Sequence, residues 1–264
     1  MSDAPGLRAC IGIDIGGTSI KSGLIDVGGS LIGELHSVPV AGDPLGAVEQ
    51  AARVAQADRP TCEVLGVGIG SPGYLDAART HVEYSVNLGW RQLPLVELVQ
   101  NMLSLAVVLE GDAFVAALGE AIAGGGRGHR DVLAVTLGTG VGVGHVVDGT
   151  IVAGAHGMAG QAGHIPMPGI RATCSCGRVG CWELGASTSA LDRAARQAGY
   201  AGAREVLEDP AAQAIVHPWA DAVAAGLVML AAIIDPDVIV IGGAASASAD
   251  HFLPRVREQV SVVA

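Results

Sequence analysis

Three of the five cysteines in this 264-residue chain lie within one short segment, Cys174-Ser-Cys-Gly-Arg-Val-Gly-Cys181, and His164 precedes that segment by ten residues. Three thiolates and one imidazole complete the tetrahedral coordination of a structural Zn²⁺ and leave no position for a catalytic water. The alternative is three unrelated buried thiols. The odd number of cysteines and their crowding favour a metal site over a disulfide framework. The same pattern favours a reducing compartment. The sequence therefore predicts a zinc loop with ligands His164, Cys174, Cys176 and Cys181, in a cytoplasmic protein.

Composition and charge exclude some partners. Hydrophobic residues make up 50% of the chain but aromatic residues only 3%, so we expect an aliphatic core. The formal net charge of -11 argues against a nucleic-acid surface, which needs clustered Lys and Arg. The longest uninterrupted apolar run, 222–234, has 13 residues, fewer than the ~17–25 that a spanning helix needs. We expect neither nucleic acid nor membrane as a partner.

Strand and helix patterns alternate along the chain and predict the α/β class. We expect strands at 9–15, 31–38, 63–71, 106–109, 132–137, 141–147 and 238–241, and a second strand near residues 20–25. Helices are expected at 44–57, 94–103, 112–123, 182–197, 204–207 and 211–234. No Ser- or Pro-rich linker separates two halves, so a domain boundary would be compact and lie near 111–124.

The two halves share a faint internal repeat. At an offset of 122 residues, Gly16 falls on Gly138 and Asp26 falls on Asp148, and the strand positions around them match. Each half therefore has the order strand, glycine-rich turn, strand, turn. Two such turns that face each other would form two phosphate-binding jaws.

The first glycine-rich turn follows a buried strand and contains Asp14, Gly16, Gly17 and Thr18. Its backbone N–H groups and hydroxyl could approach a phosphate, while the Asp14 carboxylate holds Mg²⁺ or its water shell. An ordinary hairpin turn explains the same residues equally well, because glycine-rich turns alone are weak evidence.

The second turn contains Gly138, Thr139 and Gly140. It is not a Walker loop, because no Gly-Lys-Ser/Thr follows, and it leads into a strand, unlike a dinucleotide fingerprint. Phosphate binding by main-chain amides is the favoured interpretation, and a glycine-rich sheet corner is the alternative.

A carboxylate also follows the strand at 106–109, in Glu110-Gly111-Asp112. Asp112 at a helix start could project as a general base. Asp is also among the commonest helix N-caps, and position alone favours the cap.

Several motifs together carry a resemblance to a known family, and they run through nearly the whole chain. They are Asp14-Ile-Gly-Gly-Thr18, Ser71-Pro-Gly73, Asn87-Leu-Gly-Trp90, Glu110-Gly-Asp112, Ala117-Leu-Gly-Glu120, Thr136-Leu-Gly-Thr-Gly140, Ala159-Gly-Gln-Ala-Gly-His164, Cys174 to Glu183, and Ile241-Gly-Gly243. The chain resembles the ROK family of bacterial sugar kinases and sugar-responsive repressors, particularly its glucokinase-like members. The cysteine motif with its upstream Gly-His is highly specific to that family.

The resemblance implies two actin-like (RNase H-like) lobes around a central cleft, where ATP–Mg²⁺ and a hexose meet. The expected lobes are residues 1–115 and 116–264, and the second carries the zinc loop. The implied activity is ATP-dependent phosphorylation of a hexose or related sugar at the 6-hydroxyl, and the family commonly forms dimers.

The resemblance also assigns roles to residues of this chain. Asp112 becomes the base that takes the proton from the sugar hydroxyl. The residues implied at the sugar are Gly73, Asn87, Gln161, His164 and Glu183. Those implied at the nucleotide are Asp14, Gly16, Gly17, Thr18, Gly138, Thr139, Gly140, Gly242 and Gly243.

Two other functions within the family are considered. The chain has Gly111, Phe114 and Gln161 where many members have Asn, Asn and Glu, and it ends soon after 251–260 where members continue. These departures motivate a non-catalytic sugar-binding sensor as the alternative. A DNA-binding repressor is set aside, because the expected first strand starts near residue 9 and leaves little room for a helix-turn-helix ahead of it.

Overall fold

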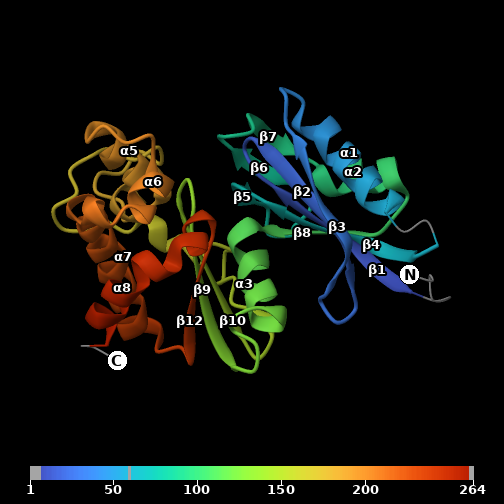
Figure 1. Cartoon of the computed structure of the whole chain (residues 1–264). Helices are drawn as coiled ribbons and strands as arrows, with labels where there is room; N and C mark the ends of the chain where they lie inside the picture. Colours follow the sequence, from blue (N-terminus) through green and yellow to red (C-terminus); the bar gives the residue numbers. More distant parts are fainter. Residues whose placement is uncertain (1–6, 59–60, 262–264) are drawn as a thin grey trace. The chain divides into compact units, whose positions relative to one another are not determined.

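The computed structural model describes residues 7–58 and 61–261, and the expected α/β class is confirmed. The chain divides into two compact units (Figure 1). Unit 1 contains residues 1–115, 122–124 and 155–157. Unit 2 contains residues 116–121, 125–154 and 158–264.

Unit 1 is built on a five-stranded sheet in the order β3-β2-β1-β4-β8. The strands are β1 (Arg8–Ile15), β2 (Ser19–Asp26), β3 (Leu31–Pro39), β4 (Glu63–Ser71) and β8 (Val107–Gly111). The first three form an antiparallel meander, whereas β4 runs parallel to β1 and β8 runs parallel to β4. The carboxyl ends of β1, β4 and β8 therefore meet at one edge of the sheet.

Two helices of unit 1, α1 (Pro44–Ala57) and α2 (Leu95–Leu103), pack on this sheet and bury an aliphatic core. Asp43 caps α1: its Oδ1 accepts a hydrogen bond from the Gly46 N–H at 3.0 Å. Ser22 on β2 is buried, and its hydroxyl donates to the Ala51 carbonyl of α1 at 2.7 Å. This bond fixes the helix on the sheet.

The sequence did not predict a three-stranded sheet in unit 1. It is formed by β5 (Tyr74–Leu75), β6 (Val82–Ser85) and β7 (Trp90–Leu93) in that order. The strands are short, and their apolar residues do not alternate over enough positions to give a clear signal. The helix α3 (Asp112–Ala123) follows β8 directly.

Unit 2 is built on a four-stranded sheet in the order β11-β10-β9-β12. The strands are β9 (Asp131–Leu137), β10 (Val141–Val147), β11 (Thr150–Ile151) and β12 (Val238–Gly242). As β1 pairs antiparallel with β2 and parallel with β4, β9 pairs antiparallel with β10 and parallel with β12. The offset repeat in the sequence thus corresponds to the same local arrangement in both units.

Helical segments make up most of the remainder of unit 2. They are η1 (Gln161–His164), α4 (Glu183–Ala186), α5 (Thr188–Gln197), α6 (Ala203–Glu208), η2 (Pro210–Ala212), α7 (Gln213–Ile234), η3 (Ala244–His251) and α8 (Leu253–Val260). The single helix expected over 182–197 is wrong. Ser187 is extended (φ -71°, ψ 159°) and its side chain caps α5, so the helix breaks there.

The segment Pro210–Ile234 consists of η2 and α7 and spans 25 residues. By length and composition alone, it is long and apolar enough to cross a membrane. Within the described chain, however, one side of α7 contributes to the core of unit 2. Trp219 on this helix is 4% exposed and donates its indole N–H to the Ala186 and Ser187 carbonyls, each at 3.0 Å. The helix thus packs as a core helix of unit 2.

Trp182 joins the cysteine segment to α7. Its side chain is fully buried, and its indole N–H donates to the Ala222 carbonyl at 2.7 Å. A Cβ placed on Gly226, one helical turn later, would overlap the indole ring. Gly226 is therefore required by the close approach of Trp182 to the helix backbone.

We expect Gly226→Ala to lower the free energy of unfolding by about 1–3 kcal/mol, because the new methyl group must displace a packed indole. Replacing Gly by Ala inside a helix otherwise stabilises by about 1 kcal/mol. Gly119→Ala in α3 is the matched control, since a Cβ there has nothing within 4 Å. Urea unfolding of both variants checks this. Equal stability of the two variants would contradict it.

Candidate functional site

The edge at which β1, β4 and β8 end collects the predicted residues of unit 1. Asp14 on β1 pairs with Gly70 on β4, and Gly70 pairs with Glu110 on β8. Asp112 begins α3 two residues later, and a Cβ on Gly70 would lie 3.6 Å from the Asp112 Cα. Gly70 therefore lies between the strand that carries Asp14 and the start of α3 at Asp112.

The turn between β1 and β2 is tight. The Gly16 N–H donates to the Ser19 carbonyl at 3.0 Å, and a Cβ on Gly16 would lie 2.7 Å from that oxygen. A Cβ on Gly17 would lie 3.5 Å from the Asn87 Cβ. The structure thus brings the Gly16–Thr18 turn and Asn87, which are far apart in the sequence, to the same place.

Asp112 combines an accessible carboxylate with a perturbed pKa. Its residue surface is exposed, yet the surrounding protein removes part of the hydration that its charged form requires. This desolvation raises the pKa of the Asp112 carboxyl, and the negative charge of Asp14 raises it further. The Ala113 N–H, which donates to Asp112 Oδ1 at 2.7 Å, acts in the opposite direction. Asp112 is thus the first residue of α3, and only one of its two carboxylate oxygens accepts this backbone N–H.

Gly73 is the other predicted sugar residue of unit 1, and Gly111 and Phe114 are the departures from the family pattern. Gly73 has φ +107°, and a Cβ there would collide with the Tyr84 carbonyl. Phe114 is 7% exposed, and its ring lies 3.4 Å from the position of a Cβ on Gly111. Phe114 is therefore a core residue beside the Gly111 backbone.

Sequence reasoning missed an ion pair that supports Asp112. Arg79 has φ +56°, and its Nε lies 2.9 Å from Glu110 Oε1, with both side chains about four-fifths buried. The same Glu110 oxygen accepts the Gly111 N–H at 2.8 Å. The pair fixes the backbone that leads into Asp112. Nothing in the local sequence around Arg79 signals a partner 31 residues away.

The predicted nucleotide residues of unit 2 meet at the carboxyl ends of the parallel strands β9 and β12. The Gly138 N–H donates to the Gly140 carbonyl at 3.0 Å and closes the turn after β9. Gly242 pairs with Thr136, and Gly243, with φ +84°, lies so close to Leu137 that a Cβ would be 2.6 Å from its carbonyl oxygen. Two glycine segments therefore adjoin at this edge.

The four predicted metal ligands form one group. The candidate ligand atoms of His164, Cys174, Cys176 and Cys181 all lie within 4.8 Å of one another. Cys176 Sγ and Cys181 Sγ are 3.5 Å apart, and Cys174 Sγ is 3.6 Å from His164 Nδ1. Zn–S bonds of about 2.3 Å at tetrahedral angles give similar edges of ~3.8 Å, so the residues fit Zn²⁺. Gly177 and Gly180, with φ near +85°, let the loop turn sharply.

The electrostatics of the group suit a metal. Burial, together with hydrogen bonding and charge at Cys176 and Cys174, raises the pKa of the Cys181 thiol to about 12. Without a cation, the Cys181 thiol therefore stays protonated. A metal ion would supply the positive charge that three neighbouring thiolates require.

Glu183 lies between the cysteine group and the Gly138–Gly140 turn. Its Oε1 is 2.9 Å from Cys174 Sγ and 3.4 Å from His164 Nδ1. A Cβ on Gly140 would lie 2.8 Å from Glu183 Oε2. Gln161 is exposed at the start of η1, the turn that ends at His164. Glu183 thus contacts the metal group directly, and Gln161 lies in the same short helical turn as the candidate ligand His164.

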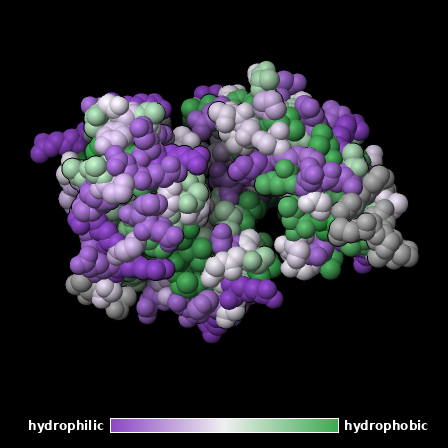
Figure 2. Space-filling model, viewed as in Figure 1, coloured by the Kyte–Doolittle hydropathy of each residue, from purple (hydrophilic) through white to green (hydrophobic). Residues whose placement is uncertain are grey.

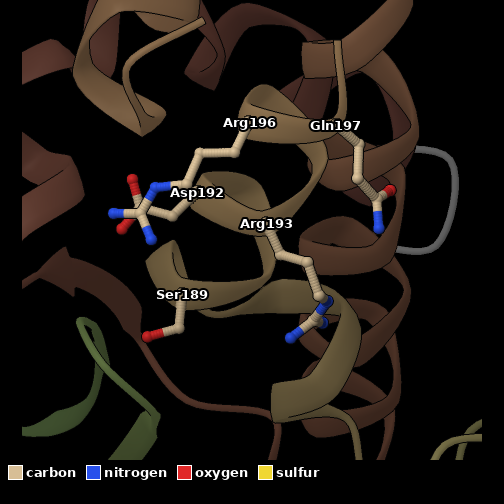
Figure 3. A pocket seen from close by; sticks show the side chains of 5 residues that line it. All are labelled: Ser189, Asp192, Arg193, Arg196 and Gln197. Atoms are coloured by element: carbon tan, nitrogen blue, oxygen red, sulfur yellow. The ribbon is translucent and has the colours of Figure 1, made fainter. Parts of the chain in front are cut away.

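A surface pocket of about 430 Å³ lies along α5, directly after Thr188. Figure 3 shows that its lining side chains all come from this one helix: Ser189, Asp192, Arg193, Arg196 and Gln197. Hydrophilic residues predominate on the visible surface around α5 and α6 (Figure 2). The pocket offers hydrogen-bonding groups and two arginines.

Comparisons with known proteins identify the family of the chain. The model of the ROK family matches residues 10–264. A glucokinase from Streptomyces coelicolor is 36% identical over 94% of this chain and 86% of its own length. The crystal structure of a ROK family glucokinase from Streptomyces griseus with glucose and AMPPNP covers 95% of this chain and 88% of its own, with 33% identity and a TM-score of 0.84.

A putative xylose repressor from Caldicellulosiruptor is also similar, with 30% identity over 95% of this chain and 69% of its own length. The family match and these identities show that the chain belongs to the ROK family. The expected actin-like fold is confirmed by the likeness to the family's solved structures.

We expect purified protein to contain about one zinc ion per chain, because four ligands complete a tetrahedral site. Cys181→Ser removes a buried ligand and should lower the zinc content and the melting temperature together. Cys10→Ser, at an exposed cysteine on β1, is the control and should change neither. Elemental analysis with thermal unfolding measures both. Full zinc content in the Cys181 variant would show that the group is not the metal site.

Proposed function

We propose that this ROK family chain is an ATP-dependent sugar kinase that phosphorylates a hexose or a related sugar, at the 6-hydroxyl. The observation that carries the proposal is the position of Asp112, which is close enough to Asp14 for the charge of Asp14 to contribute to its raised pKa. The glucokinase relatives support the class of substrate and the use of ATP.

In this proposal Asp112 accepts the proton of the sugar hydroxyl as that oxygen attacks the terminal phosphorus. A raised pKa makes the ionised carboxylate of Asp112 a better proton acceptor than that of an ordinary surface Asp. Asn87 and Gly73 at the same edge hold the sugar so that one hydroxyl faces Asp112. Orientation of this kind supplies much of the catalysis of phosphoryl transfer.

The glycine turns hold the other substrate. Backbone N–H groups of Gly16–Thr18 in unit 1 and of Gly138–Gly140 in unit 2 donate to the phosphates, and Gly242-Gly243 lies near the adenosine. Asp14 binds Mg²⁺ or its water. Bound Mg²⁺ supplies charge neutralisation of the phosphates. Asp112 belongs to unit 1 and the second glycine turn belongs to unit 2.

Zinc acts as a structural ion in this proposal. His164 presents Nδ1 to the cysteine sulfurs, which leaves Nε2 for a sugar hydroxyl. A metal that fixes one ring nitrogen also fixes the orientation of the other. Glu183 and Gln161, attached to the same loop, complete the sugar contacts.

The proposal also concerns the cellular compartment of the chain and its binding partners. Thiolate ligands require a reducing compartment, which supports cytoplasmic placement. A net charge of -11 supports the absence of a nucleic-acid partner, and the core packing of α7 supports the absence of a membrane one. A homodimer is expected from the family.

The direct test is ATP-dependent phosphorylation across a panel of hexoses and N-acetylhexosamines, with Asp112→Asn as the blank. We expect turnover on at least one sugar, reduced by about 10²–10⁴-fold in the variant. The variant should melt at the same or a higher temperature, because a raised carboxyl pKa means that the charged form is disfavoured in the folded state. Asp148→Asn, in an exposed turn, is the matched control and should keep full activity.

The family's second function gives a different result in the same assay. Gly111 and Gln161 favour a sugar-binding sensor without turnover. Folded, zinc-loaded protein that binds a sugar but consumes no ATP across the panel would support the sensor and exclude the kinase.

The pH profile of kcat/KM should lose activity on the acid side above the ordinary Asp pKa of about 3.9, because protonation of Asp112 removes the proton acceptor and its pKa is raised. Steady-state rates measured against pH, with tryptophan fluorescence to follow folding, check this. Full activity in folded protein down to pH ~4 would contradict the assignment of Asp112 as the base.

A further inference from the structure

Thr188 holds one carbonyl of the glycine turn in unit 2 with two hydrogen bonds. Its backbone N–H donates to the Gly138 carbonyl at 2.9 Å, and its Oγ1 donates to the same oxygen at 2.6 Å. The two residues are 50 positions apart in the sequence. Thr188 is the first residue of α5, and Ser187, which caps that helix, keeps it in place.

Because a peptide unit is planar, these two hydrogen bonds to the Gly138 carbonyl also determine the direction of the next N–H group. The Gly138 carbonyl and the Thr139 N–H belong to the same planar trans peptide, so they point in opposite directions. Two donors on the carbonyl side therefore fix the plane of the peptide. The Thr139 N–H is then aimed away from α5 and toward the open side of the turn.

The open side of the turn has donors without partners. Among the described residues, no backbone hydrogen bond outside the regular strands uses the N–H of Thr139 or of Gly140. The Gly138 N–H is already taken by the Gly140 carbonyl, which closes the turn behind them. Two adjacent, unpaired and oriented N–H groups are the kind of donor pair that binds a phosphate oxygen.

We infer that Thr188 is a positioning residue for the phosphoryl donor: by holding the Gly138 carbonyl it orients the Thr139 N–H toward a phosphate. The inference rests on the proposed kinase function and deepens it. Thr188 itself touches no substrate in this role. The Thr188 hydroxyl gives no signal in the sequence, because in Ser187-Thr188-Ser189 it resembles an ordinary helix start.

Thr188→Val tests the inference, because Val keeps the shape and the backbone N–H but removes the hydroxyl. Binding of a non-hydrolysable ATP analogue with Mg²⁺, measured by calorimetry, should weaken by about fivefold to tenfold, the value of one hydrogen bond. The KM for ATP should rise by a similar factor, while the KM for glucose stays unchanged. Thr188→Ser, which retains the hydroxyl, should bind the analogue within about twofold of the wild type.

Ser187→Ala is the matched control. It removes the 3.2 Å bond from the Ala190 N–H to the cap and loosens the start of the same helix without touching Gly138. This variant should melt at a lower temperature but bind the analogue normally. Equal weakening in the Ser187 and Thr188 variants would mean that general loosening of α5 matters and would overturn the inference.

The remaining outcomes separate this inference from the proposed function. Wild-type protein that binds the analogue, with a Thr188→Val variant that binds it equally well, overturns the positioning role and leaves the kinase proposal intact. Wild-type protein that binds no analogue at all overturns both, because the turn then has no phosphate to receive.

Discussion

Parallel pairing of strands is the constraint on which the rest of this structure depends. Because β1, β4 and β8 run in the same direction, their carboxyl ends meet, and residues separated by about a hundred positions become neighbours. Asp14 and Asp112 are close enough for the charge of one to raise the pKa of the other for this reason alone. The same pairing of β9 with β12 brings Gly243 against Leu137, beside the second glycine turn. Each unit therefore gathers its polar groups at one edge of its sheet.

In unit 2 the short segment 181–188 connects the metal group, the hydrophobic core and the Gly138–Gly140 turn. Cys181 belongs to the metal group, Trp182 is locked against α7, Glu183 lies under Gly140, and Thr188 holds Gly138. Because these contacts follow one another within a few residues, the position of the turn depends on the loop that the metal closes. A structural ion thus has a direct mechanical link to the place where phosphate is proposed to bind.

The sequence predicted the fold class and the grouping of His164 with the three cysteines because the signals for both are local. Glycine-rich turns, strands of alternating burial and a dense cysteine segment each lie within ten residues or so. The sequence failed to predict features that only the contacts of the folded chain reveal. The break at Ser187 depends on a cap that only the folded helix shows. The small sheet β5-β6-β7 consists of strands too short to have a period. The Arg79–Glu110 pair needs two segments that only the sheet brings together.

The interlock of Trp182 with Gly226 also limits how this chain can diverge. A larger residue at position 226 is tolerated well only after position 182 has changed to a smaller side chain. The two positions therefore form an epistatic pair in which the substitution at 182 has to come first. Position 182 directly follows a metal ligand and carries its own bond to Ala222, which makes that first step unfavourable. Helix α7 is thereby held to its present sequence at this point by a residue of the cysteine loop.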